Sequence, residues 1–412
     1  MNTTTTSSSP LAMAPTPVAL PSPRERPDIL RRFTLDGSKE LEHRLAVVCE
    51  RIRAALCGLF PAGKLEALLL GGGYGRGEGG VLSTPEGDRP YNDLEFYVFL
   101  RGNRHLNEMR YHRALDVLGH ILTPQIGIEV EFKIASLDEF VRSPVSMFSY
   151  DLVTGHRLLV GREELLDDCG HHMIATNIPL SECSRLLMNR CSGLLFAREL
   201  LEKTDSSFTT ADADFIRRNI AKASLALGDA VLTARGGYHW SCRERHHRLM
   251  ELSPEPSLRC LEQLRHHHKV GVAFKLHPER YAGSRAQLKR HHYSVTTLAK
   301  HIWLWIESQR LNTAFSSIQD YVEDPVDKYP ETSPIRNSLV NLKVLGPGRT
   351  LRCPITRHPR ERVLNSLSLM LWEPEAFVSA HWRQRLQREL CTDAPDFPGM
   401  LAAYRELWAR VN

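Results

Sequence analysis

The stretch between residues 68 and 98 constrains this chain more than any other. It reads LLLGGGYGRGEGGVLSTPEGDRPYNDLEFYV, so an apolar run leads into a glycine-rich loop and the chain then returns as a second apolar run. Glycine has no Cβ and tolerates positive φ, and a ligand can therefore approach the backbone of such a loop closely. Because a loop that follows a strand offers bare N–H groups, this one is suited to bind an anion such as phosphate.

Two carboxylates stand in the second apolar run, where Asp93 and Glu95 are separated by one residue. In a strand, side chains at i and i+2 lie on the same face, about 6.6 Å apart. Two carboxylates in that position repel each other unless cations lie between them. Hard cations such as Mg²⁺ take oxygen ligands and bridge substrate phosphates. The loop and the paired carboxylates together predict metal-assisted chemistry on a nucleotide.

The same residues resemble the signature of the DNA polymerase β-like nucleotidyltransferase superfamily, especially its minimal nucleotidyltransferase members. In the loop, Gly72 and Gly73 match the Gly-Ser pair of that signature, and Arg76, Gly77 and Glu78 match its Arg-Gly-acid triplet. The resemblance implies that Gly72, Gly73, Arg76 and Gly77 bind the nucleotide, although Gly73 lacks the serine hydroxyl of the family. Two roles stay open for Arg76, which either pairs with the triphosphate or anchors the loop through an internal salt bridge, for example with Glu78.

The resemblance also covers the acids. Asp93 and Glu95 match the paired metal ligands of the family, with glutamate in place of the second aspartate. The superfamily places a third metal-site carboxylate on a neighbouring strand, and here the alternating run 126–136 carries Glu129 and Glu131. We favour Glu131 for that place and keep Glu129 as the alternative. The resemblance thus implies that Asp93, Glu95 and Glu131 are catalytic and hold Mg²⁺ or Mn²⁺ in a two-metal site.

The resemblance, which covers about residues 38–165, implies an enzyme. It would move a nucleoside monophosphate from an NTP, with ATP as the expected donor, to a hydroxyl acceptor and release pyrophosphate. A small molecule or a protein is favoured as the acceptor, and RNA is a third option. The alternative is a catalytically degenerate nucleotide-binding sensor or a regulatory, antitoxin-like protein, for which Gly73 is the best support.

Hydrophobic patterning predicts an α+β first part. Apolar residues recur every three or four positions over 38–60, which predicts a helix, and 126–136 alternates, which predicts a strand. The other expected elements are strands at 65–70, 91–100 and 158–160, a helix at 107–121 and a short helix at 77–82 after the loop. With the resemblance, this gives a nucleotidyltransferase-type mixed sheet flanked by helices over residues 28–178. Asp151 is expected to cap or brace a short helix, with a catalytic role as the alternative.

Residues 179–412 show helical spacing throughout and predict an α-helical substrate or partner domain. The expected helices are 180–203, 211–235, 256–270, 284–312, 362–371, 376–390 and 398–410. Residues 1–27 are rich in Thr, Ser and Pro, a composition typical of a disordered tail.

Composition narrows the class of protein further. The net charge of +5 is mild for 412 residues, so it allows an anionic partner without requiring one. Nine cysteines without a CxxC pair indicate free thiols in a reducing compartment, and we expect a cytoplasmic location. No apolar run approaches the ~20 residues of a membrane span, so no membrane partner is expected. The sequence indicates no oligomeric state.

Overall fold

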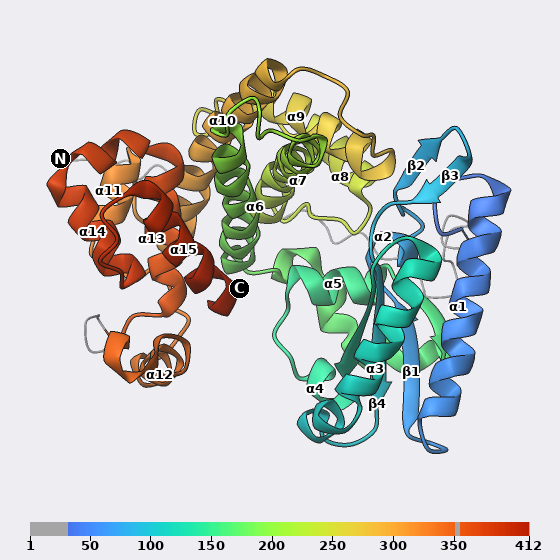
Figure 1. Ribbon diagram of the computed structural model, residues 1–412. Coiled ribbons are helices and arrows are strands. Elements are labelled where there is room, and N and C mark those ends of the chain that lie inside the picture. The colour runs from blue at the N-terminus through green and yellow to red at the C-terminus, as the bar shows by residue number, and fades with distance from the viewer. Residues whose placement is uncertain (1–31, 351–354, 412) are drawn as a thin grey trace, which may run out of the picture.

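The computed structural model describes residues 32–350 and 355–411. A small mixed sheet flanked by helices is followed by a part that is entirely helical over the residues described (Figure 1). The mixed α+β class predicted from the sequence is confirmed. The tail predicted for residues 1–27 lies outside the described residues.

Four strands form the central sheet, in the order β5-β4-β1-β6. They are β1 (Leu65–Leu70), β4 (Leu94–Leu100), β5 (Val130–Ala135) and β6 (Arg157–Val160). Strand β1 pairs antiparallel with β4 and with β6, whereas β4 and β5 are parallel. A parallel pair needs a crossover connection, and α3 (Arg104–Ile126) provides it.

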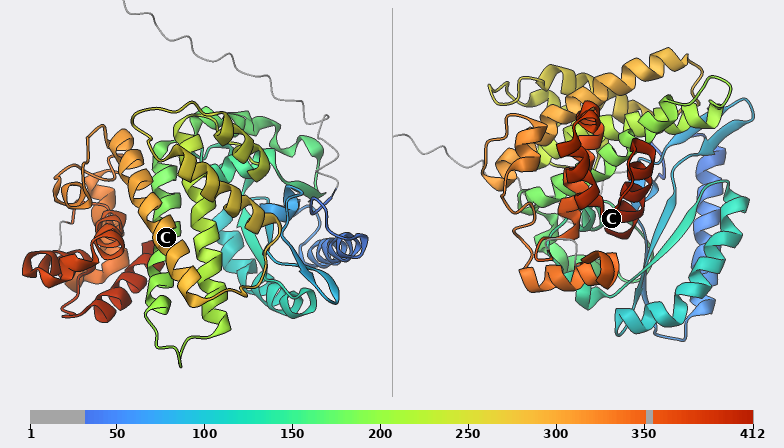
Figure 2. Two further views of the ribbon diagram at one scale, coloured as in Figure 1. Left: turned by 90° about the horizontal axis from the view of Figure 1, so that it is seen from above. Right: turned by 60° about the vertical axis from the view of Figure 1, so that its left-hand side comes forward.

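Helices cover both faces of this sheet. One face packs against α3 and α1 (Lys39–Leu59), and α1 begins where the Ser38 hydroxyl accepts a hydrogen bond from the N–H of Leu41. The other face packs against α4 (Leu137–Val141), α5 (Met147–Thr154) and the 3₁₀ segment η3 (Glu163–Met173). Both views in Figure 2 show α1 and α3 on the side of the sheet that faces away from the helical part.

Two details around the loop differ from the sequence prediction. The short helix is α2 (Gly72–Gly75), not 77–82, because Gly77 takes a φ of +76° and ends it. The residues that follow form a hairpin of β2 (Val81–Thr84) and β3 (Gly87–Pro90). Strand β5 also begins later than residue 126, because α3 runs to Ile126 and Gly127 turns the chain with a φ of +83°.

The helical part surrounds one large apolar core. Its elements are α6 (Leu180–Leu201), α7 (Thr210–Ala234), α8 (Cys242–Glu251), α9 (Leu261–Leu276), α10 (Arg285–Leu311), α11 (Ile318–Glu323), α12 (Pro334–Thr350), α13 (Pro359–Trp372), η5 (Pro374–Val378), α14 (Ala380–Leu390) and α15 (Phe397–Val411), with η4 (Ala175–Asn177) leading into them. Helices α8, α11 and α12 were not predicted, and the helix predicted at 256–270 is displaced to α9. No helix in the described ranges is both long and apolar enough to cross a membrane.

The helical part packs against the sheet part next to the glycine-rich loop. Tyr238, in the segment before α8, contacts Tyr150 of α5 edge to face at 5.6 Å between ring centroids. Cys242 and Leu276 form a small apolar cluster that also includes Leu35. These contacts bring α7 opposite the start of β4, where the predicted carboxylates lie (Figure 1).

Candidate functional site

The three predicted carboxylates lie together on the sheet. Asp93 directly precedes β4, Glu95 lies on β4, and Glu131 is the register partner of Glu95 on the parallel neighbour β5. Adjacent strands are about 4.8 Å apart, so residues in register on one face are close neighbours. Burial raises the pKa of Asp93, and the negative charges of Glu131 and Glu95 raise it further. Glu129, the alternative to Glu131, lies before β5 and is exposed.

A lysine stands between two of these acids. The Lys133 Nζ lies 3.3 Å from Glu95 Oε1 and 3.1 Å from Glu131 Oε2, and 5.6 Å from the centroid of the Tyr97 ring. Burial acts to lower the pKa of Lys133, but the two carboxylates outweigh it and the pKa is raised. The lysine is therefore charged at neutral pH and offsets much of the repulsion between Glu95 and Glu131.

Cations of the helical part face the acids from the opposite side. Lys222 and Arg218 are one turn apart on α7, and Arg190 lies on α6. Lys222 is exposed to solvent, yet it stands among enough protein atoms that burial lowers its pKa, and the charges of Arg190 and Arg218 lower it further. The negative charges of Asp93 and Glu95 act to raise the pKa of the same lysine. A lysine whose charge is disfavoured by burial and by two neighbouring arginines forms, with them, an electrostatic site for an anion.

The glycine-rich loop passes directly beside Glu95. Gly72 adopts a φ of +61°, and a Cβ built on it would lie 3.0 Å from Glu95 Oε2. Its neighbour Gly71 donates its N–H to the carbonyl of Glu95 at 2.9 Å. Helix α2 begins at Gly72, and the N–H groups of a first helical turn have no carbonyl partner within the helix. Gly72 and Gly73 therefore bring backbone donors next to the carboxylates.

A buried tyrosine fixes the shape of this loop. The hydroxyl of Tyr74 donates to the carbonyl of Gly80 at 2.9 Å and accepts the N–H of Tyr91 at 2.9 Å. Gly80 in turn donates its N–H to the side-chain oxygen of Asn92, also at 2.9 Å. These bonds tie the end of the loop to the residues immediately before Asp93, so the loop and the acids form one rigid unit.

The Arg76 side chain forms a salt bridge inside the protein. Its Nη1 lies 2.9 Å from Asp151 Oδ2, and both side chains are largely buried. Of the two roles that the sequence left open, the structure contains the internal salt bridge, with Asp151 as the partner in place of Glu78. The bridge continues into the helical part, because Tyr238 donates its hydroxyl to Asp151 at 3.3 Å and accepts from Arg245 at 3.2 Å.

Glu78 has a structural partner of its own. Its carboxylate accepts the hydroxyl of Ser241 at 2.5 Å and the N–H of Cys242 at 2.9 Å, where α8 begins. An acid at a helix N-terminus is favourable because it meets both free N–H groups and the positive end of the helix dipole. The loop is thus joined to the helical part at Glu78 as well as at Arg76.

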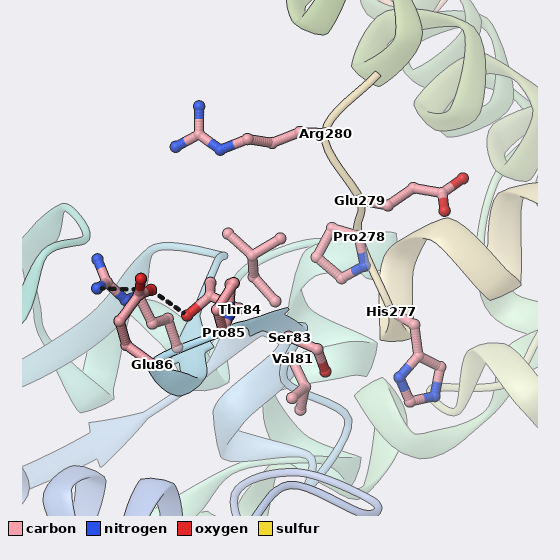
Figure 3. Close-up of a pocket in the computed structure, with 11 residues that line it drawn as sticks. Val81, Ser83, Thr84, Pro85, Glu86, His277, Pro278, Glu279 and Arg280 are labelled. Atoms are coloured by element: carbon pink, nitrogen blue, oxygen red, sulfur yellow. Dashed lines mark hydrogen bonds and ion pairs between the residues drawn. The ribbon is translucent and has the colours of Figure 1, made fainter. Parts of the chain in front are cut away.

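Two adjoining cavities flank the β2–β3 hairpin. The larger, about 680 Å³, lies between the β2–β3 hairpin, the end of α3 and the first turns of α7, and Tyr91 and Arg218 line its inner end. The smaller, about 530 Å³, lies between the hairpin and residues 277–280 (Figure 3). The two cavities share part of their lining, which makes them one continuous groove.

The three acids are the candidate donor set for a metal ion. Over residues 32–350 and 355–411, no three His, Cys, Asp or Glu side chains are already arranged as a metal site. Asp93, Glu95 and Glu131 nevertheless supply the oxygen donors that Mg²⁺ and Mn²⁺ prefer. A metal ion between Glu95 and Glu131 would displace the Lys133 ammonium, which now occupies that position.

Sequence reasoning missed the cations of α6 and α7. A signal was present for Lys222, which is a single charged residue among buried Ile220, Ala221 and Ala223. The position of Lys133 between two acids depends on the register of β4 and β5, which local sequence patterning does not contain.

Comparisons with known proteins add no evidence about the function of this site. No protein-family model matches the chain, and no curated protein matches it significantly.

Proposed function

We propose that this protein is a nucleotidyltransferase that moves a nucleoside monophosphate from an NTP, with ATP as the expected donor, to the hydroxyl of a small molecule or a protein. The observation that carries the proposal is that Asp93, Glu95 and Glu131 lie together beside a glycine-rich loop. This arrangement of a phosphate-binding loop and three acids is that of the DNA polymerase β-like nucleotidyltransferases, so a fold of that type is part of the proposal.

The cations of the helical part support binding of a polyphosphate. Lys222, Arg218 and Arg190 lie near the acids, and the charges of the two arginines lower the pKa of Lys222. A triphosphate between the two sides would be neutralised by these cations and by the backbone N–H groups at Gly72 and Gly73. Arg76 acts indirectly, because its salt bridge with Asp151 holds the loop in place.

Asp93, Glu95 and Glu131 would hold Mg²⁺ or Mn²⁺, and bound ions of this kind activate a hydroxyl and stabilise a leaving pyrophosphate. The protein orients the acceptor hydroxyl for in-line attack on the α-phosphorus. A new oxygen–phosphorus bond forms, the bond from the α-phosphorus to the bridging oxygen breaks, and pyrophosphate leaves with the bonding electrons. Glu131 takes the proton of the hydroxyl and then releases it to water. Positioning and charge neutralisation supply most of the rate.

A nucleotide-binding sensor is the second candidate, and one observation favours it. The Lys133 ammonium bridges Glu95 and Glu131, so these two acids are already neutralised without a metal ion. A regulatory or antitoxin-like protein built in this way would bind an NTP through the loop and the α7 cations without needing Mg²⁺.

Thermal stability with each of the four NTPs, with and without Mg²⁺ or Mn²⁺, separates the two candidates. A ligand present at 100 times its Kd adds about 2.7 kcal/mol to stability, which is a measurable melting shift. The test variant is Asp93→Ala with Glu95→Ala, and the matched control is Asp138→Ala with Glu139→Ala, a pair of exposed acids on α4.

The transferase requires a metal-dependent shift that the test variant loses and the control keeps. A metal-independent shift that both variants retain favours the sensor. The absence of a shift with every NTP refutes both candidates.

A further inference from the structure

The hairpin groove is the continuous space formed by the two cavities described above. The residues common to both are Leu82, Glu86, Arg89, Glu279 and Arg280. One wall is the β2–β3 hairpin and the other is the segment that follows α9 (Figure 3). At about 530 and 680 Å³, each cavity is in the range of small-molecule sites.

One end of the groove lies at Tyr91 and Arg218, and Arg218 is close enough to Asp93 to lower the pKa of that carboxyl. Ala211, Asp214 and Arg218 line it from α7, and Lys222 continues the same helical face to the acids. The step from Ala211 to Lys222 covers eleven residues of α7, which correspond to about 16 Å along the helix axis. Tyr91, two residues before Asp93, lines the same end. One end of a molecule in the groove would therefore lie near Asp93.

The acids that line the groove already have partners. Asp214 accepts the N–H of Tyr281 at 2.8 Å, and Asp88 accepts the N–H of Ser38 at 2.8 Å. Glu279 lies 3.4 Å from Arg217, and Figure 3 shows its side chain turned away from the hairpin. In the same way Glu86 lies 3.5 Å from Arg89. These carboxylates are not available to attract a cationic ligand.

Of the cations that line the groove, Arg89 pairs with Glu86, and the other arginines are less engaged. In the described ranges, no salt bridge joins Arg44 or Arg218 to a carboxylate, and Arg44 donates only to the carbonyl of Asp88. The guanidinium of Arg280 lies 3.9 Å from Asp214, its side chain is 83% exposed, and in Figure 3 it extends over the opening. A guanidinium matches the geometry of phosphate and carboxylate groups. The groove thus has guanidinium groups available for an anion and, in Tyr91 and Phe215, apolar surface for the body of a ligand.

We propose that the hairpin groove binds the acceptor, and that the acceptor is a small hydroxylated molecule that carries an oxyanion, either a phosphate ester or a carboxylate. The oxyanion lies against Arg44 and Arg280 at the outer end, and the hydroxyl lies at the inner end near Asp93. This assignment of the acceptor rests on the proposed nucleotidyl transfer, in which the hydroxyl oxygen bonds to the α-phosphorus, its proton passes to Glu131, and pyrophosphate leaves.

Calorimetric titration of the full chain tests the groove with three matched probes: ribose 5-phosphate, ribonate and ribose. The test variant is Arg44→Gln with Arg280→Gln, because both side chains are exposed and their replacement leaves the core intact. The control is Arg104→Gln, which removes an exposed arginine at the opposite end of α3 from the groove. ATP with Mg²⁺ is titrated in parallel into each protein.

The expected result is that at least one charged probe binds the wild type tenfold or more tightly than ribose. The test variant should lose that preference tenfold, while the control and ATP binding are unchanged. Preference for ribose 5-phosphate assigns a phosphate ester, and preference for ribonate assigns a carboxylate.

Three results overturn the proposal: no binding of either charged probe, equal binding of ribose, or an unchanged affinity in the test variant. If the charged probes bind as expected but ATP does not bind at all, the nucleotidyl transfer fails and the acceptor role fails with it, while the groove remains an oxyanion site.

Discussion

Replacement of Asp151 by asparagine tests the internal role of Arg76. The Arg76–Asp151 pair has an N–O distance of 2.9 Å and side-chain exposures of 11% and 21%. Asp151→Asn leaves the Arg76 guanidinium buried without its carboxylate, whereas nearby Arg245 keeps its salt bridge with Asp229 at 2.7 Å. Breaking a buried pair in this way costs about 3–5 kcal/mol.

The assay is thermal and urea unfolding, followed by circular dichroism and tryptophan fluorescence. At about 2–4 °C per kcal/mol, Asp151→Asn should lower the melting temperature by roughly 6–20 °C. Arg76→Gln should cost less, because Asp151 keeps Arg245 nearby. The double variant should be less destabilised than the sum of the two by about 1–3 kcal/mol.

The control is Arg53→Gln, which breaks an exposed pair with Glu50 and should change stability very little. Strict additivity of Arg76→Gln and Asp151→Asn would refute the internal role. So would a loss of NTP binding in Arg76→Gln without any loss of stability, since that result requires direct contact with the nucleotide.

Two further predictions concern the site and a third concerns the helical part. Gly72→Ala places a Cβ at a φ of +61°, so it should lower the free energy of unfolding by about 1–2 kcal/mol and weaken NTP binding. Gly87→Ala, also at positive φ but with open space around it, should lower stability and leave NTP binding intact. Urea unfolding and NTP titration measure the two effects. Lys222→Met should weaken NTP binding tenfold or more at an unchanged or higher melting temperature, because burial and two arginines already disfavour the charge; a large loss of stability would contradict this. Burial lowers the pKa of His358 to about 4 from its ordinary 6.5. Between these pH values the unfolded chain binds a proton that the folded chain does not, so stability should fall as the pH drops from 6.5 to 4. His358→Gln should flatten the slope of melting temperature against pH, and an unchanged slope would refute the assignment.

The sequence predicted the elements that carry a periodic pattern. Helix α1 and strand β5 follow from apolar spacing, and the same alternation put Glu131 on the polar side of its strand. The pairing of Glu131 with Glu95 depends on the register of two strands that a 23-residue helix separates, and local patterning contains no information on it.

The contacts of two loop residues could not be predicted from the sequence because their partners are distant in the chain. The partner of Arg76 is 75 residues away, and that of Glu78 lies at the start of a helix more than 160 residues away. The β2–β3 hairpin was missed for a local reason. A short helix was expected at 77–82 after the glycine-rich loop, and the positive φ of Gly77 does not allow a helix to begin there.

The most direct test of the central claim is a measurement of protein-bound Mn²⁺ by electron paramagnetic resonance in the presence of ATP. It compares the wild type with Glu131→Gln and with Glu129→Gln, the exposed acid two residues earlier. If Asp93, Glu95 and Glu131 form one metal site for the nucleotide, Glu129→Gln should match the wild type and Glu131→Gln should bind Mn²⁺ at least tenfold more weakly. Equal Mn²⁺ binding by all three proteins, or the absence of ATP-dependent binding in the wild type, would contradict the account.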